Sequence, residues 1–68
     1  MTKLEQERKR RGLSQTALAA AAGKLSASDI SRMERAWQKP YPAQAKRIAR
    51  VLGLKPDELT EPAAPPAA

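Results

Sequence analysis

The sequence predicts an all-α fold of five short helices in one small domain. Residues that cap helix N-termini recur along the chain, and glycines stand where helices would end. One segment also repeats its apolar residues at the spacing of an amphipathic helix. The chain has 68 residues, of which 41% are hydrophobic, so it can form one core and has no room for a large substrate cavity.

The first helix is expected to begin after Thr2 and to run to about Arg11. Thr2 and Glu5 have the spacing of a capping box, in which each residue satisfies a free backbone N–H of the other. Basic residues fill the last turn, where they complement the negative end of the helix dipole. Gly12 follows and can adopt the left-handed conformation that ends a helix.

The second and third helices are expected over Gln15 to Ala22 and over Ala27 to about Arg35. Ser14 precedes the second helix as a good N-cap, and the alanine-rich body that follows has high helix propensity. Ser26 precedes the third helix, and Asp29 places an acid in its first turn. Each helix therefore has its own start signal.

The fourth helix is the clearest amphipathic segment of the chain. Pro42 suits its first position, and Gly53 suits its end. Its apolar residues recur at i, i+3, i+4 and i+7, at Ala45, Ile48, Ala49 and Leu52. A last short helix is expected over residues 56–59, so that the domain spans residues 1–60. Residues 61–68, mainly proline and alanine, are expected to form a disordered tail.

The charge balance points to a polyanionic partner. Lysine and arginine total 13 against 7 acids, which gives a net charge of +6. Residues 1–53 hold 12 basic and 4 acidic residues, a net charge of +8, whereas residues 54–68 carry a net charge of −2. Because the positive charge belongs to the helical body of a small domain, nucleic acid is the first candidate.

Composition argues against several other classes of protein. The chain has no cysteine and no histidine, so we expect no disulfide, no thiolate site, no transition-metal site and no cofactor. No apolar run approaches the roughly 20 residues needed to cross a bilayer, and the N-terminus lacks the apolar core of a signal peptide. We therefore expect a cytoplasmic location. The acid clusters are explained as helix starts or solvated ends, so we expect no enzyme.

The second and third predicted helices, joined by a turn that contains Gly23, have the form of a helix-turn-helix. Such a unit inserts its second helix into the major groove of DNA. Ile30 and Met33 lie three residues apart and predict the buried face of the third helix. Ser28 and Arg32 then point away from the core and are free to contact DNA.

An ordered set of residues extends this pattern over nearly the whole chain, from Leu4 to about Leu59. It comprises Arg8, Gly12-Leu13-Ser14-Gln15, Leu18-Ala19, Gly23, Ser26, Ile30-Ser31-Arg32-Met33-Glu34-Arg35, Pro40, Ile48-Ala49-Arg50-Val51-Leu52-Gly53-Leu54 and Asp57-Glu58-Leu59. In this order the residues resemble the Cro and phage-repressor family of helix-turn-helix regulators, also called Xre-type. The resemblance implies a compact five-helix, lambda-repressor-like domain that binds double-stranded DNA and regulates transcription as a repressor. It also implies a homodimer on inverted repeats.

The resemblance further implies roles for individual residues. The third helix becomes the recognition helix, with base-reading residues Ser26, Ala27, Ser28 and Arg32. Phosphate contacts are expected from Ser14, Gln15, Arg35 and Lys39. Arg8 and Glu34 match a pair that forms a structural ion pair between the first and third helices. Two of these roles also make physical sense alone: Arg32 can fork onto guanine O6 and N7, and Gln15 lies beside free N–H groups at a helix N-terminus.

Several residues keep more than one interpretation. Asp29 can accept a hydrogen bond from cytosine N4 or cap its helix, and capping is favoured. Trp37 can be a core residue, an interface anchor or a sugar-phosphate contact, and core or partial burial is favoured. Tyr41 can donate to phosphate or cover the last helices. The turn from Gly23 to Ser26 is one residue longer than the commonest spacing in relatives, so that contact positions can shift by one.

Partners also leave alternatives open. Without a second domain, the self-contact of a homodimer is expected near Leu54 and Leu59, in a patch so small that the dimer could form only on DNA. The alternative function is a protein-interaction module, such as the antitoxin of a toxin-antitoxin pair or a phage-type adaptor, which a co-purifying partner would distinguish. A non-specific single-strand binder would need more stacking aromatics than Trp37 and Tyr41.

Overall fold

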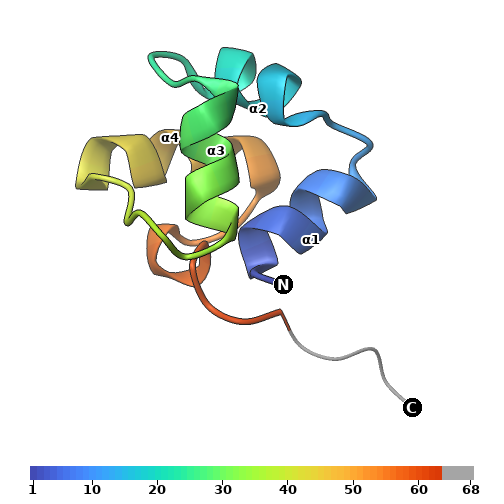
Figure 1. The fold of residues 1–68 in the computed structure, drawn as a ribbon, viewed down its shortest axis with the longest axis vertical. Coiled ribbons are helices and arrows are strands. Elements are labelled where there is room, and N and C mark those ends of the chain that lie inside the picture. The colour runs from blue at the N-terminus through green and yellow to red at the C-terminus, as the bar shows by residue number, and fades with distance from the viewer. Residues whose placement is uncertain (64–68) are drawn as a thin grey trace.

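The structure, a computed structural model, describes residues 1–63 and shows a bundle of short helices (Figure 1). The elements are α1 (Lys3–Arg10), α2 (Gln15–Ala22), α3 (Ala27–Glu34), α4 (Pro42–Leu52) and a 3₁₀ turn, η1 (Pro56–Glu58). The all-α prediction is confirmed for this part of the chain. None of these helices is long and apolar enough to cross a membrane.

The prediction of five helices is wrong, because the residues described contain four α-helices. The fifth expected helix is the single turn η1, closed by the i to i+3 hydrogen bond from Glu58 N to Lys55 O at 2.9 Å. Pro56 supplies no N–H, and Leu59 turns into the core directly after the turn, so the segment is too short for an α-helical ladder. Arg11 and Arg35, expected as the last residues of their helices, are C-caps.

The predicted caps explain where the helices begin. Ser14 Oγ accepts from Ala17 N at 2.9 Å, and Ser26 forms a reciprocal capping box with Asp29. Thr2 Oγ1 accepts from the backbone N–H of Glu5 at 3.3 Å, but the expected return bond is replaced, because the Glu5 carboxylate pairs with Lys9 at 2.9 Å. That ion pair lowers the pKa of Glu5. The start of a helix can therefore be predicted from residues close in sequence. The partner of a longer side chain such as that of Glu5 cannot, because several partners lie within its reach.

The core lies where the four helices meet. α4 contributes the four apolar residues that the sequence spacing predicted, and all of them are buried. Ile30 and Met33 of α3 are fully buried against them, as their spacing also predicted. The remaining buried apolar side chains are Leu4, Leu18, Ala19 and Leu59.

Leu59 corrects one expectation. It was expected in a self-contact patch with Leu54, but Leu59 is 0% exposed and Leu54 is half-buried against the core. A short turn brings Leu59 back over α4, and the domain's own core takes up its side chain. Leu59 is therefore not available for the predicted dimer contact, and Leu54 is available only in part.

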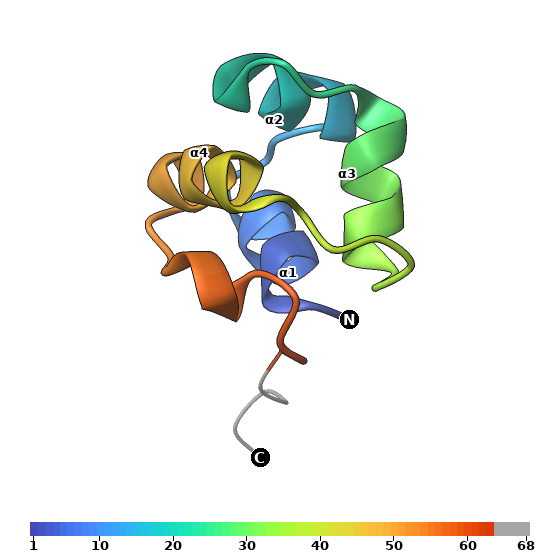
Figure 2. The ribbon, with the colours of Figure 1, turned by 90° about the vertical axis from the view of Figure 1, so that its left-hand side faces the viewer.

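The two ends of the described chain pair with each other. Lys3 N donates to Glu61 O at 2.9 Å, and Ala63 N donates to Met1 O at 2.8 Å. The Lys3 ammonium also contacts the carboxylates of Glu58 and Glu61, at 3.4 and 3.0 Å. Figures 1 and 2 both show the segment after η1 beside the N-terminus. Residues 61–63, expected to begin a disordered tail, are thus paired, and the rest of that segment lies outside the described residues.

Candidate nucleic-acid interface

α2 and α3 form the helix-turn-helix that the sequence predicted, and they pack against each other. The turn between them changes direction through two residues with positive φ, Gly23 at 82° and Lys24 at 59°. A lysine in this conformation is uncommon. Figures 1 and 2 show α3 at the outside of the bundle, with only one side turned to the other helices.

The outer side of α3 carries the candidate base-reading residues. Ser28 and Arg32 are both exposed and lie one helical turn apart. Ile30 and Met33 anchor the opposite side in the core, which fixes the direction of the outer side chains. Ala27 is only half-exposed. The helix therefore presents a narrow polar surface in which Arg32 is the one long cation.

Ser26 differs from the other predicted base-reading residues because its hydroxyl is already engaged. Its Oγ accepts from Asp29 N at 3.2 Å and donates to Asp29 Oδ2 at 3.1 Å. The Ser26 backbone N–H also donates to Oδ2, and this bond is the main cause that lowers the pKa of the Asp29 carboxyl. Asp29 thus caps the helix, as favoured from the sequence. Donation to a base by Ser26 would require its hydroxyl hydrogen to leave Asp29, whereas one lone pair of Oγ stays free to accept.

The candidate phosphate-binding residues of α2 lie at its N-terminus. Ser14 is exposed, and its hydroxyl caps the helix. Gln15 is half-buried, and its Nε2 donates to Glu34 Oε1 at 3.1 Å. An amide nitrogen carries two hydrogens, and no described residue accepts the second one. One donor therefore remains at the surface beside the start of α2.

Glu34 is the centre of a buried polar network. The structure brings it together with Arg8, whose guanidinium contacts both carboxylate oxygens through Nε and Nη2. Arg8 Nη1 also donates to Leu13 O at 2.8 Å, and Thr2 Oγ1 donates to Glu34 O at 3.3 Å. The side chains of Glu34 and Arg8 are only 4% and 11% exposed. The network ties α1, α3 and the loop before α2 into one rigid support for the candidate interface.

Cations on α1 and on the α3 side have different surroundings. Lys9 pairs with Glu5, and Arg10 and Arg11 both contact Glu7, so these α1 cations are offset by neighbouring carboxylates. Arg32, Arg35 and Lys39 are exposed and form no ion pair with any residue from 1 to 63. Cations without an ion-pair partner among residues 1–63 are therefore present on α3 and on the loop that follows it.

Trp37 overturns the expectation of core or partial burial. Its side chain is 73% exposed, and the Arg35 guanidinium lies 5.0 Å from its ring centre, in cation–π contact. The backbone explains this position, because Trp37 N donates to Arg32 O at 2.9 Å and Ala36 has a φ of 59°, which turns the chain outward. Tyr41 is also 73% exposed and does not cover the last helices. The sequence around them gave no signal of this exposure beyond a polar loop.

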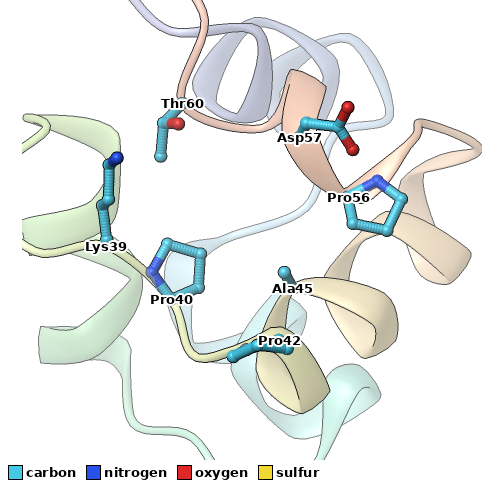
Figure 3. Close-up of a pocket in the computed structure, with 7 residues that line it drawn as sticks. All are labelled: Lys39, Pro40, Pro42, Ala45, Pro56, Asp57 and Thr60. Atoms are coloured by element: carbon cyan, nitrogen blue, oxygen red, sulfur yellow. The ribbon is translucent and has the colours of Figure 1, made fainter.

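A shallow hollow of about 290 Å³ lies on the other side of this loop (Figure 3). Three prolines line it, and Lys39 and Asp57 stand on opposite sides of it. Lys39, predicted to bind phosphate at the groove edge, thus lies at the rim of this hollow. Its polar lining residues are Lys39, Asp57 and Thr60.

Comparison with known proteins agrees with the helix pair described above. A protein-family model described as a helix-turn-helix domain matches residues 2–62, which is almost the whole described chain. The match includes the segment after η1 that pairs with the N-terminus. No match is found among curated proteins or among solved structures.

Proposed function

The chain belongs to the helix-turn-helix domain family, and on that premise we propose that it is a sequence-specific regulator that binds double-stranded DNA. We further propose that it is of the Cro and phage-repressor type and acts as a repressor. The observation that carries the proposal is the outer surface of α3, where Ser28 and Arg32 are exposed one turn apart and Arg32 forms no ion pair with any of residues 1–63.

In the proposed complex, α3 enters the major groove. Arg32 reads guanine through a bidentate bond to O6 and N7, and Ser28 contacts a neighbouring base edge. Ala27 contributes a methyl contact, which suits thymine. Gln15 donates its second amide hydrogen to a phosphate, which fixes the register of α3 without reading sequence. We propose that the protein regulates by occupying its site and not by a catalytic step.

The proposed assembly is two copies on an inverted repeat, with half-sites about one helical turn apart. Leu59 lies in the core, so only the half-buried Leu54 remains of the predicted self-contact, which is too little for a stable dimer in solution. We therefore propose that the two copies meet only on DNA. The tail of residues 64–68 plays no part in this proposal.

The test is selection of bound sequences from a randomised duplex pool at physiological salt. An enriched motif with guanine at a fixed position supports the proposal, and an inverted repeat supports two copies on DNA. A single short motif would replace the assembly of two copies by a monomer. No enrichment by a folded protein would overturn the proposed function and make a protein partner the next candidate.

A further inference from the structure

The second half of the domain has an unusual charge composition. From Arg35 to Pro56 the chain contains no acidic residue. The same segment contains six cations, which are Arg35, Lys39, Lys46, Arg47, Arg50 and Lys55. None of the six forms an ion pair with any residue of the described chain. The segment thus carries a positive field that the domain does not neutralise.

Three of these cations share one side of α4. Lys46, Arg47 and Arg50 lie opposite the side that Ile48 and Leu52 bury in the core. We call these three residues the α4 basic stripe. Lys46 and Arg50 are exposed one helical turn apart, and Arg47 is half-exposed. The stripe is therefore set by helix geometry and not by flexible loops.

Exposed cations on α1 do have carboxylate partners. Lys9 and Arg10 are as exposed as the stripe, yet each has a carboxylate partner within its own helix. On α4, by contrast, Lys46 and Arg50 are like charges at i and i+4, an arrangement that weakens a helix. An anion from outside the domain would relieve this repulsion.

The composition of the α4 basic stripe favours phosphate over a protein surface. Protein interfaces have an apolar core enriched in aromatic residues, whereas the stripe consists of three cations and contains no aromatic or large apolar side chain. One helical turn rises about 5.4 Å. Successive phosphates of a DNA strand rise about 3.4 Å along the axis, so Lys46 and Arg50 can face neighbouring phosphates.

The stripe is also continuous along the chain with the proposed DNA surface. Arg35 and Lys39 lie in the loop that joins α3 to α4, and no acid interrupts them. Figure 2 shows this loop leading directly into the start of α4. A run of cations therefore begins at the end of α3 and continues along α4.

We propose that the α4 basic stripe binds phosphates of DNA that flanks the sequence contacted by α3, in the same duplex. This inference rests on the proposed function and extends its footprint. It requires the flanking duplex to bend toward the side of the domain. The free energy that bending the duplex costs would be offset by the added phosphate contacts, which carry no sequence information.

The experiment compares two double variants that lose the same charge. Lys46→Gln/Arg50→Gln removes the exposed part of the stripe, and Lys9→Gln/Arg10→Gln is the matched control on α1. Each protein, checked for folding by circular dichroism, is titrated with two duplexes over a range of salt concentrations. One duplex ends at the enriched motif, and the other extends it by about 15 base pairs on each side, or more than one helical turn.

We expect the stripe variant to bind the extended duplex roughly ten- to thirty-fold more weakly than the wild type at about 0.15 M salt. We also expect its salt-dependence slope to fall by about two, with sequence preference unchanged. On the short duplex the stripe variant should match the control. Equal slopes for the two variants on the extended duplex would overturn the inference and direct attention to an acidic protein partner.

Two further outcomes separate this inference from the proposed function. Complexes of one protein with two short duplexes, seen by sedimentation, would mean that the stripe binds a second duplex, which overturns binding within one duplex. Failure of the wild type to bind either duplex would overturn the proposed function, and the inference with it. Binding by the wild type with no effect of the stripe variant overturns the inference alone.

Discussion

The Gln15 side chain is held by Glu34, to which its amide nitrogen donates a hydrogen bond of 3.1 Å across 19 positions of sequence. Glu34 is in turn fixed by the Arg8 guanidinium. A residue proposed to contact phosphate is therefore oriented by a buried ion pair before any DNA arrives. Such preorganisation lowers the side-chain entropy that binding would otherwise cost.

Gln15→Ala tests the phosphate role of this amide. We expect it to weaken DNA binding about tenfold, or about 1.4 kcal/mol, equally for all sequences, because a phosphate contact carries no base information. The salt-dependence slope should stay near that of the wild type, because the amide carries no charge. Affinities measured by fluorescence anisotropy for the enriched motif and a scrambled duplex provide the check. A change in sequence preference would instead mean that Gln15 contacts a base.

Arg32→Ala tests base reading by α3. We expect a loss of about 1 to 3 kcal/mol in binding free energy and a relaxed preference at one base pair. Arg10→Ala is the matched control, because Arg10 is exposed and lies on α1 with a carboxylate partner. Repeating the sequence selection with both variants measures the effect. Unchanged preference in Arg32→Ala would show that another side of the domain reads the bases.

Glu34→Ala tests the buried network. We expect it to lower the free energy of unfolding by about 3 to 5 kcal/mol, because it leaves the Arg8 guanidinium buried without its partner. Arg8→Ala should have a loss of similar size, and the double variant should lose less than the two single variants combined, because the residues act together. Urea denaturation of the three variants measures this. Additive losses would mean that the pair is not coupled.

The pH dependence of unfolding tests the capping box of α3. Because hydrogen bonds from Ser26 lower the pKa of Asp29 below 3.8, ionised Asp29 stabilises the folded state above that pH. This contribution is lost as pH falls through the lower pKa of the folded state. Asp29→Asn should therefore lower the thermal midpoint more at about pH 6 than at about pH 3. An equal difference at both pH values would contradict an ionic role for the cap.

Local signals account for the parts of the fold that the sequence predicted. Ser14 and Ser26 mark helix starts through hydrogen bonds to residues three positions on, so they can be recognised without the tertiary structure. The buried side of α4 follows from the spacing of its apolar residues. The prediction that Trp37 is buried was wrong. Burial depends on whether the aliphatic core has room for an indole, and local sequence patterns do not determine this.

Parts of the candidate site could also be predicted from the sequence. Ser28 and Arg32 follow from the buried positions of α3, since the outer side of a helix is fixed once its inner side is known. The engagement of Gln15 by Glu34 could not be predicted from spacing, because it joins two helices. Charge pairing on α1 was readable from the sequence by contrast, because Lys9 and Arg10 stand four and three residues after their carboxylate partners.

Leu59→Ala tests whether the last turn belongs to the core or to a self-contact. Leu59 is 0% exposed, and its carbonyl accepts from Leu4 N at 3.1 Å, which ties the turn to α1. We expect the truncation to lower the free energy of unfolding by about 2 to 5 kcal/mol, with no dependence on protein concentration. Leu54→Ala, at a half-buried position, is the control and should have a smaller effect, because less apolar surface returns to water. Urea denaturation at two protein concentrations about a hundredfold apart measures both variants. A wild-type midpoint that rises with concentration, and a Leu59→Ala midpoint that does not, would show that Leu59 stabilises a dimer and not the core of the single domain.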